Sequence, residues 1–136
     1  MRIASAFSIA VVSISLNLQV IAVDESKAPS SASKFDLSAS EIQSYSKSAF
    51  GGTDPKAGFR LFQYFAITRN SREEALKWLR LSATQGYIDA EYSLGVILVD
   101  SEETKKEGME WLKRASDKGD ARAKNLLKLE RASDKH

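Results

Sequence analysis

The stretch EEALKWLRLSATQGYIDAEYSLGVI, residues 73–97, decides the fold of this chain of 136 residues. Its apolar residues recur three and four positions apart, which is the spacing of one face of an α-helix. Gly86 interrupts the pattern, and the same spacing resumes after it. A helix, a tight turn and a second helix are therefore predicted here.

A second copy of the pattern follows in EGMEWLKRASDKGDARAKNLLKLE, residues 107–130, and one constant offset relates the two copies. The matched pairs are Ala75 and Gly108, Leu76 and Met109, Trp78 and Trp111, Leu79 and Leu112, Gly86 and Gly119, Ala90 and Ala123, and Leu94 and Leu127. The same offset applied upstream places Ala57 on Ala90 and Leu61 on Leu94. Matches at one offset indicate an internal repeat, so three helix pairs are predicted.

Capping residues mark the predicted helix ends. Capping-box spacing occurs at Ser38 with Glu41, Ser71 with Glu74, and Thr104 with Glu107, and further N-caps are expected at Asp54, before Pro55, at Asp89 and at Asp120. Gly86 and Gly119 are expected to end helices in the left-handed conformation. Ala90 and Ala123 are small enough to let two helices approach closely. The chain is therefore predicted to be all-α from residue 37 onward.

These residues resemble the Sel-one-like repeat, a tetratricopeptide-like unit that reads approximately A-x-x-W-Y-x-x-A-A-x-x-G-x-x-x-A-x-x-x-L-G. The first copy matches at Ala75, Trp78, Leu79, Ser82, Ala83, Gly86, Ala90, Leu94 and Gly95, and the second at Trp111, Leu112, Ala115, Ser116, Gly119, Ala123 and Leu127. The resemblance implies a short right-handed α/α-solenoid of about three helix-turn-helix hairpins that binds partner proteins. Two departures are a shorter link at residues 100–103 and a leucine after each tryptophan, where the family often has tyrosine.

The resemblance also divides the chain. It implies a helical repeat domain over residues 37–132, with a degenerate unit at 38–70, further units at 71–100 and 104–131, and a tail at 133–136. Residues 23–36 are rich in serine and are predicted to form a flexible linker.

The start of the chain has the pattern of an export signal. After Arg2 the next charged residue is Asp24, and the segment between them is mostly apolar. This pattern is typical of a secretory signal peptide, here residues 1–22, with cleavage after Ala22. An uncleaved membrane anchor is the alternative, although polar residues dilute the apolar segment. A periplasmic or secreted protein is therefore predicted, with no membrane contact after signal removal.

Composition excludes several kinds of function. The chain has no cysteine, one histidine at position 136 and a net charge of +2. Disulfides, thiolate metal sites and cysteine nucleophiles are therefore excluded, and the small charge argues against nucleic-acid binding. The neighbouring acids Glu73 and Glu74, and the pair Glu107 and Glu110, lie in predicted first helical turns, where the helix dipole favours them. We expect no enzyme, metal or cofactor.

Five residues are candidates for contact with a partner: Trp78, Leu81, Trp111, Tyr64 and Tyr87. The tryptophans occupy equivalent positions, where packing between repeats is favoured over an aromatic groove. Leu81 aligns with Arg114, and an apolar residue on a polar stripe can mark a contact surface. The four aromatic residues of segment 59–65 cannot all point to one face of a helix, so one or more of them is either exposed or, as we favour, covered by the preceding helix.

The function predicted from these features is a protein–protein interaction scaffold in the bacterial periplasm. Among exported proteins that resemble this family, one use is immunity against a type VI secretion effector, and an envelope adaptor fits the same features. A small-ligand-binding or hydrolytic protein with a groove near Trp78 and Trp111 is an alternative from another class. Stacking of apolar end faces into a homo-oligomer is a further alternative.

Overall fold

Every regular element in the computed structural model, which describes residues 34–133, is helical. The elements are α1 (Ala39–Phe50), α2 (Pro55–Gln63), η1 (Tyr64–Thr68), α3 (Arg72–Thr84), α4 (Ile88–Val99), α5 (Lys105–Asp117) and α6 (Ala121–Ser133). The predicted all-α class is confirmed for this part of the chain. The predicted signal peptide, residues 23–33 of the predicted linker and residues 134–136 of the predicted tail lie outside the described residues.

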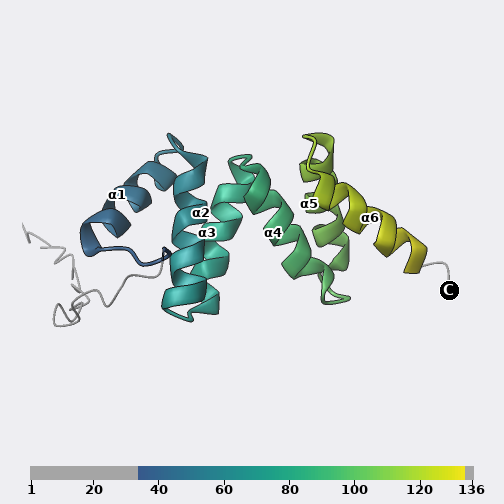
Figure 1. Ribbon diagram of the computed structural model, residues 1–136, viewed down its shortest axis with the longest axis horizontal. Helices are drawn as coiled ribbons and strands as arrows, with labels where there is room; N and C mark the ends of the chain where they lie inside the picture. Colours follow the sequence, from purple (N-terminus) through teal and green to yellow (C-terminus); the bar gives the residue numbers. More distant parts are fainter. Residues whose placement is uncertain (1–33, 134–136) are drawn as a thin grey trace, which may run out of the picture.

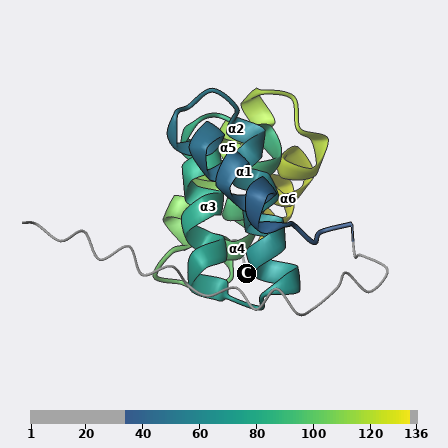
Figure 2. The ribbon, with the colours of Figure 1, turned by 90° about the vertical axis from the view of Figure 1, so that its left-hand side faces the viewer.

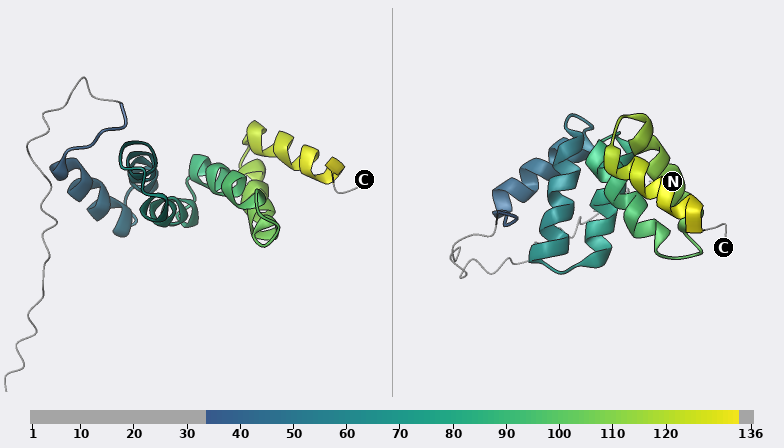
Figure 3. Two further views of the ribbon diagram at one scale, coloured as in Figure 1. Left: turned by 90° about the horizontal axis from the view of Figure 1, so that it is seen from below. Right: turned by 45° about the vertical axis from the view of Figure 1, so that its right-hand side comes forward.

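The helices follow one another along an elongated body, from α1 at one end to α6 at the other (Figure 1). A view along the long axis places α1 in front of the remaining helices (Figure 2). Seen from below, the chain advances along the body from α1 to α6 without turning back (Figure 3). Each helix therefore packs mainly on its neighbours in the sequence, and the contact between α4 and α5 is the most extensive.

The helices begin at regular intervals along the chain. α1, α3 and α5 begin at residues 39, 72 and 105, and α2, α4 and α6 begin at residues 55, 88 and 121. The interval is the same in every case and equals the offset that relates Ala75 to Gly108 in the sequence. The turn glycines Gly86 and Gly119 have φ angles of 88° and 96°, the left-handed conformation expected for them.

Three predicted helix starts are confirmed. Ser38 Oγ accepts a hydrogen bond from the Glu41 backbone N–H at 3.3 Å, and the Glu41 carboxylate accepts one from the Ser38 N–H at 2.8 Å. Asp54 accepts from the Lys56 N–H at 3.0 Å. Asp120 accepts from the backbone N–H groups of the second and third residues of α6, at 2.8 and 3.1 Å. Each cap satisfies backbone donors that the first helical turn leaves unpaired.

Three other predicted caps are wrong. Ser71 and Thr104 precede α3 and α5, but neither side chain accepts a hydrogen bond from its helix. Thr104 Oγ1 donates to the Leu98 carbonyl at 2.7 Å instead, which ties the start of α5 to the end of α4. Asp89 lies inside the first turn of α4, because that helix begins at Ile88. A hydroxyl that donates to a distant backbone carbonyl is not used to cap its own helix. The spacing of residues in the sequence does not show which of these two hydrogen bonds forms.

Two clusters of buried apolar side chains lie between the helices. The first contains Leu79, Ala83, Ala90, Leu94 and Leu98 from α3 and α4, and the second contains Leu112, Ala115, Ala123 and Leu127 from α5 and α6. Full burial of a leucine contributes about 1.5–3 kcal/mol relative to exposure. The apolar residues that match between the two copies of the sequence therefore form the core.

Two glycines allow α4 and α5 to approach closely. A Cβ atom at Gly108 would lie 2.7 Å from the Val99 backbone nitrogen and 2.9 Å from the Gly95 carbonyl oxygen. A Cβ atom at Gly95 would lie 2.7 Å from Leu112 Cγ. The two backbones therefore meet at a separation that leaves no room for a side chain.

Candidate partner-binding groove

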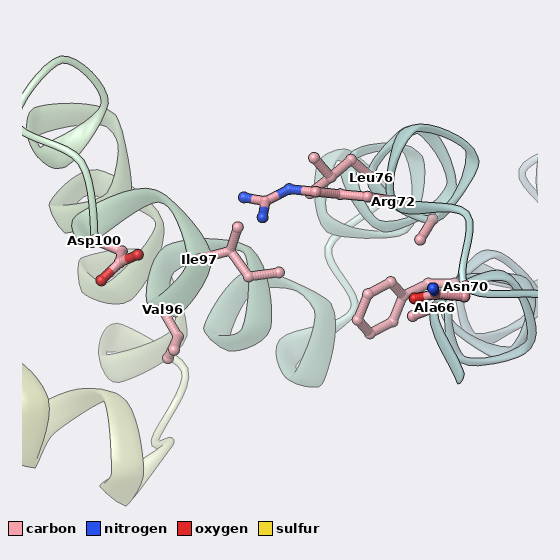
Figure 4. A pocket seen from close by; sticks show the side chains of 9 residues that line it. Ala66, Asn70, Arg72, Leu76, Val96, Ile97 and Asp100 are labelled. Atoms are coloured by element: carbon pink, nitrogen blue, oxygen red, sulfur yellow. The ribbon is translucent and has the colours of Figure 1, made fainter. Parts of the chain in front are cut away.

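An open groove of about 520 Å³ lies between η1, the start of α3 and the end of α4 (Figure 4). Its lining residues are Phe62, Ala66, Asn70, Arg72, Ala75, Leu76, Val96, Ile97 and Asp100. Most of these are apolar, and the others supply an amide, a guanidinium and a carboxylate. The groove thus combines an apolar surface with a few polar groups, as binding sites commonly do.

The apolar part of the groove belongs to the outer side of the first core cluster. Phe62, Leu76 and Ile97 are half-buried and pack against that cluster. Val96 is 38% exposed. Packing of α3 against α4 therefore fixes these side chains in place while leaving part of their surface available to a second molecule.

The η1 side of the groove contains two unusual backbone features. η1 is a π-helix, in which the Arg69 N–H donates to the Tyr64 carbonyl at 3.1 Å. Asn70 has a φ angle of 49°, the only positive value at a non-glycine residue between 34 and 133. π-helical turns are found preferentially at functional sites, and a positive φ is uncommon outside glycine, although asparagine adopts it more readily than most residues. Ala66 and Asn70, one from each feature, both line the groove.

Two oppositely charged side chains in the groove have no partner within the part of the chain that the structure describes. Arg72 and Asp100 are exposed, and neither side chain forms an ion pair or a hydrogen bond with any residue from 34 to 133. Figure 4 shows the Arg72 guanidinium extending from α3 toward the α4 wall, where Ile97 lies. Both charges are therefore available to a ligand.

The predicted candidate Trp78 does not line this groove. Its ring contacts Phe50 of α1, with ring centroids 5.0 Å apart and planes at 53°. Its indole Nε1 is buried and has no hydrogen-bond partner among the described residues. Phe50, which covers this ring, remains 73% exposed.

Trp111 has a different environment and also lies outside the groove. Its Nε1 donates to Glu107 Oε1 at 3.2 Å, and the Arg114 guanidinium lies 4.6 Å from the ring centroid. Glu107 also pairs with Arg80 of α3, and this hydrogen bond lowers the pKa of the Glu107 carboxyl. The two tryptophans therefore have separate neighbours.

The other three candidates lie at different depths. Tyr64 is only 9% exposed and its ring contacts Phe65, so it offers little surface to a partner and we remove it from the candidate site. Tyr87 is half-buried against Phe59, with ring centroids 5.3 Å apart, and burial raises its pKa. Leu81 is half-buried on α3.

Arg72, Val96 and Ile97 were not among the residues predicted from the sequence. One sequence signal does point to them. The offset of the repeat places Arg72 on Lys105, which keeps the positive charge, but places Ile97 on Glu130, which exchanges an apolar side chain for a carboxylate. The exchange indicates a difference between the two helix pairs only once the structure shows that the Arg72 side chain extends toward Ile97.

A second, more polar hollow of about 400 Å³ lies beside the turn between α3 and α4. Glu91 is 2% exposed there, and its Oε1 accepts from Lys118 Nζ at 2.7 Å. The same ammonium donates to the Gly86 carbonyl at 3.0 Å. This ion pair ties the end of α5 to the α3–α4 turn, which is a structural role.

The remaining acidic residues do not form a metal site within residues 34–133: no group of three or more His, Asp or Glu side chains there could hold an ion. The predicted acidic pair Glu73 and Glu74 contacts Lys77 Nζ, at 3.5 and 2.8 Å. None of the helices over the same range has the length and apolar character needed to cross a membrane.

Comparison with known proteins identifies a relative. The chain shares 33% identity over 110 residues with "Uncharacterized protein YibG" of Escherichia coli (strain K12), and the alignment covers 76% of this chain and 71% of that protein. The chain belongs to the YibG family. No model of a known protein family matches it, and no solved structure matches it. The groove between η1, α3 and α4 is thus a candidate binding site in a member of the YibG family.

Proposed function

We propose that this member of the YibG family is an α-solenoid of the Sel-one-like repeat type that binds another protein in the bacterial periplasm. The observation that carries the proposal is the open, largely apolar groove between η1, α3 and α4. Exposed apolar surface of this kind is typical of interaction sites on soluble proteins. The activity proposed is therefore recognition.

The helix arrangement supports the repeat assignment. Helix pairs that begin at equal intervals and pack on their sequence neighbours are what a tetratricopeptide-like array requires. Such arrays present extended side surfaces, which suit segments of other proteins.

The form of the groove supports a protein as the occupant. Sites for small molecules enclose most of the ligand surface, whereas this groove is open to solvent. Val96, 38% exposed, adds apolar surface on the α4 wall. A protein segment can cover such an open apolar surface more completely than a small molecule can.

The periplasmic location rests on the sequence of residues 1–22, which has the pattern of an export signal. Fractionation of cells that produce the full chain tests it. A product shortened at Ala22 and recovered in the periplasm is the expected result. A full-length product in the membrane fraction would support the anchor alternative.

The binding proposal is tested by site-specific photocrosslinking in cells. p-Benzoylphenylalanine is placed at Val96 in the groove and, as a matched control, at Lys124, which is exposed on α6. We expect one predominant adduct with a second protein from position 96 and none from position 124. Mass spectrometry then identifies the partner.

The identity of the adduct separates the alternatives. A secreted toxic effector would specify an immunity protein, and an envelope protein would specify an adaptor. An adduct of this chain with itself would replace the proposal by a homo-oligomer. No adduct from position 96 would contradict binding in this groove.

A further inference from the structure

The internal repeat allows the groove to be compared with an equivalent place in the same molecule. α3 and α5 begin at residues 72 and 105, and α4 and α6 begin at residues 88 and 121, so the two helix pairs correspond residue by residue. Arg72 is the first residue of α3, and Lys105 is the first residue of α5. The two cations therefore occupy the same position, each at the start of the first helix of a pair.

In the second helix pair this cation has an acidic partner. Lys105 Nζ lies 3.4 Å from Glu130 Oε2 on α6, and the two side chains are only 22% and 23% exposed. The pair therefore joins the start of α5 to the far part of α6 in a partly desolvated place, where the attraction between the charges is stronger than in water.

In the first helix pair no acidic partner for this cation is found among residues 34–133. The residue of α4 that corresponds to Glu130 is Ile97, and the Arg72 side chain extends toward the wall that contains it (Figure 4). Arg72 has no ion pair or side-chain hydrogen bond with residues 34–133. The first pair thus has the cation and an apolar wall where the second pair has the complete ion pair.

We propose that the groove binds an apolar segment of a partner protein that carries an acidic side chain, and that this carboxylate pairs with Arg72 as Glu130 pairs with Lys105. The inference rests on the proposed function and names the chemistry of its partner. Apolar side chains of the segment contact Phe62, Leu76 and Ile97. A guanidinium can bind a carboxylate through two parallel hydrogen bonds, which also fixes the orientation of the segment.

The charges of the groove give the segment a direction. Arg72 belongs to the start of α3, and Asp100 follows the end of α4 on the opposite wall (Figure 4). An acidic residue of the segment therefore lies beside the Arg72 guanidinium, and a basic residue is accommodated beside the Asp100 carboxylate. The reverse orientation would place like charges together, which is unfavourable.

The test is selection of peptides from a phage-displayed library of random dodecapeptides on the immobilised full chain. We expect enriched sequences with apolar residues at helical or alternating spacing and at least one Asp or Glu. Binding of a selected peptide is then measured by fluorescence anisotropy against the unaltered chain and the variants.

Arg72→Glu is the decisive variant, with Arg131→Glu as the matched control. Both reverse one exposed arginine, and residue 131 lies in the last turn of α6, far along the chain from the groove. A glutamate at the first position of α3 is favourable to the helix dipole, so the fold is expected to persist. We expect Arg72→Glu to weaken binding about 10- to 100-fold and Arg131→Glu to leave it within about twofold.

Two substitutions at Val96 separate charge from apolar contact. Val96→Lys and Val96→Glu remove the same apolar surface, and only the second adds a charge that repels an acidic segment. Val96→Glu should therefore weaken binding more than Val96→Lys.

The outcomes are distinguishable from those of the crosslinking experiment. Enrichment of basic or uncharged peptides, or equal binding by Arg72→Glu and the unaltered chain, would overturn the inference. If a protein crosslinks at position 96 but acidic peptides are not enriched, the inference fails and the proposed function stands. If neither crosslinks nor peptides are found, both fail.

Discussion

The junctions between α2 and α3 and between α4 and α5 occupy equivalent places in the chain, and they differ in how closely the helices meet. The α4–α5 junction is closed by Gly95 and Gly108, whose backbones leave no room for a Cβ atom. The equivalent residues of the α2–α3 junction are Phe62 and Ala75, and both line the groove. The volume of the side chains at these two positions of each junction therefore distinguishes the closed α4–α5 junction from the α2–α3 junction, which borders the groove.

The α2–α3 junction has its closest approach elsewhere along the helices. A Cβ atom at Gly58 would lie 3.1 Å from Ser82 Cβ, and Ser82 Oγ donates to the Pro55 carbonyl at 2.6 Å. This contact holds the first turn of α2 against α3. The other end of the junction, where Phe62 lies, is left for the groove.

The substitution with the largest expected effect is Gly108→Ala, which breaks the closed junction. The new Cβ would lie 2.7 Å from the Val99 backbone nitrogen, so the helices must move apart. We expect a loss of about 2 kcal/mol in the free energy of unfolding, after allowance for the better helix propensity of alanine. Urea denaturation followed by circular dichroism measures it.

The matched control is the opposite change at the equivalent position, Ala75→Gly. Ala75 is 3% exposed, so the change removes a buried methyl group and lowers helix propensity. A loss of about 1–1.5 kcal/mol is expected. A Gly108→Ala variant as stable as the unaltered chain would show that the glycine contact does not limit the α4–α5 junction.

The next effect concerns the starts of α4 and α6, which correspond by the same offset. Asp120 caps α6, whereas its counterpart Tyr87 gives α4 no side-chain cap. Asp120→Ala should lower the free energy of unfolding by about 1–2 kcal/mol through loss of the cap, whereas any loss in Tyr87→Ala comes from the ring that packs on Phe59 and not from capping. Loss of helix signal in urea is again the measurement.

The same carboxylate predicts a pH dependence. Hydrogen bonds from Arg122 lower the pKa of Asp120, and bonds from the backbone of α6 act in the same direction. Because the folded-state pKa lies below the unfolded value of about 3.9, this stabilisation is complete well above that pH and is lost as the pH falls through the lowered pKa. Asp120→Asn should therefore lose less stability than the unaltered chain between about pH 6 and about pH 2. Parallel curves for the two proteins would contradict the assignment.

A smaller difference is expected between the two tryptophans. Trp111→Phe removes a hydrogen bond to Glu107, whereas Trp78→Phe removes a buried N–H that has no partner among the described residues. The two changes remove the same atoms, but the two rings have different neighbours, so the polar contact is isolated by repeating Trp111→Phe in a Glu107→Ala background. Trp111→Phe should cost about 1 kcal/mol more in the unaltered chain than in that background. Equal losses in thermal or urea denaturation would mean that the Glu107 contact contributes nothing.

The smallest effect sharpens the comparison of the two cations. Lys105→Gln removes a partly buried ion pair with Glu130 and should cost about 0.5–1 kcal/mol. Arg72→Gln removes a charge that has no partner in the described range 34–133 and should change the free energy of unfolding by less than about 0.5 kcal/mol. A large loss for Arg72→Gln would show that this guanidinium stabilises the fold itself.

The helices could be predicted from the sequence because their signals are local. Ser38 with Glu41, and Asp54 before Pro55, need only neighbouring residues to act as caps, and both predictions are confirmed. The Thr104 cap is wrong because its hydroxyl bonds to the Leu98 carbonyl. The π-helix was not predicted, since its wider turn continues the apolar spacing of α2.

The groove could not be predicted from the sequence, because none of the five candidates, Trp78, Leu81, Trp111, Tyr64 and Tyr87, lines it. The ring of Phe59 contacts Tyr87 at the start of α4, and the ring of Phe50 in α1 contacts Trp78, and neither contact follows from residue spacing. Trp78 and Trp111 are candidates because they occupy equivalent positions of the repeat, whereas most residues that line the groove lie outside the matched pairs of the repeat. Which side chains line the groove depends on the angle at which α3 crosses α4, and a sequence pattern does not specify that angle.

Packing between sequence neighbours has a consequence for how the molecule opens. α3 and α4 are covered by helices on both sides, whereas α1 and α6 are each covered mainly on one. Contacts between nearby segments form quickly, and in such arrays loss of structure proceeds from the ends. Fraying of α1 or α6 would leave η1, α3 and α4 in place, so the groove would outlast the ends of the molecule.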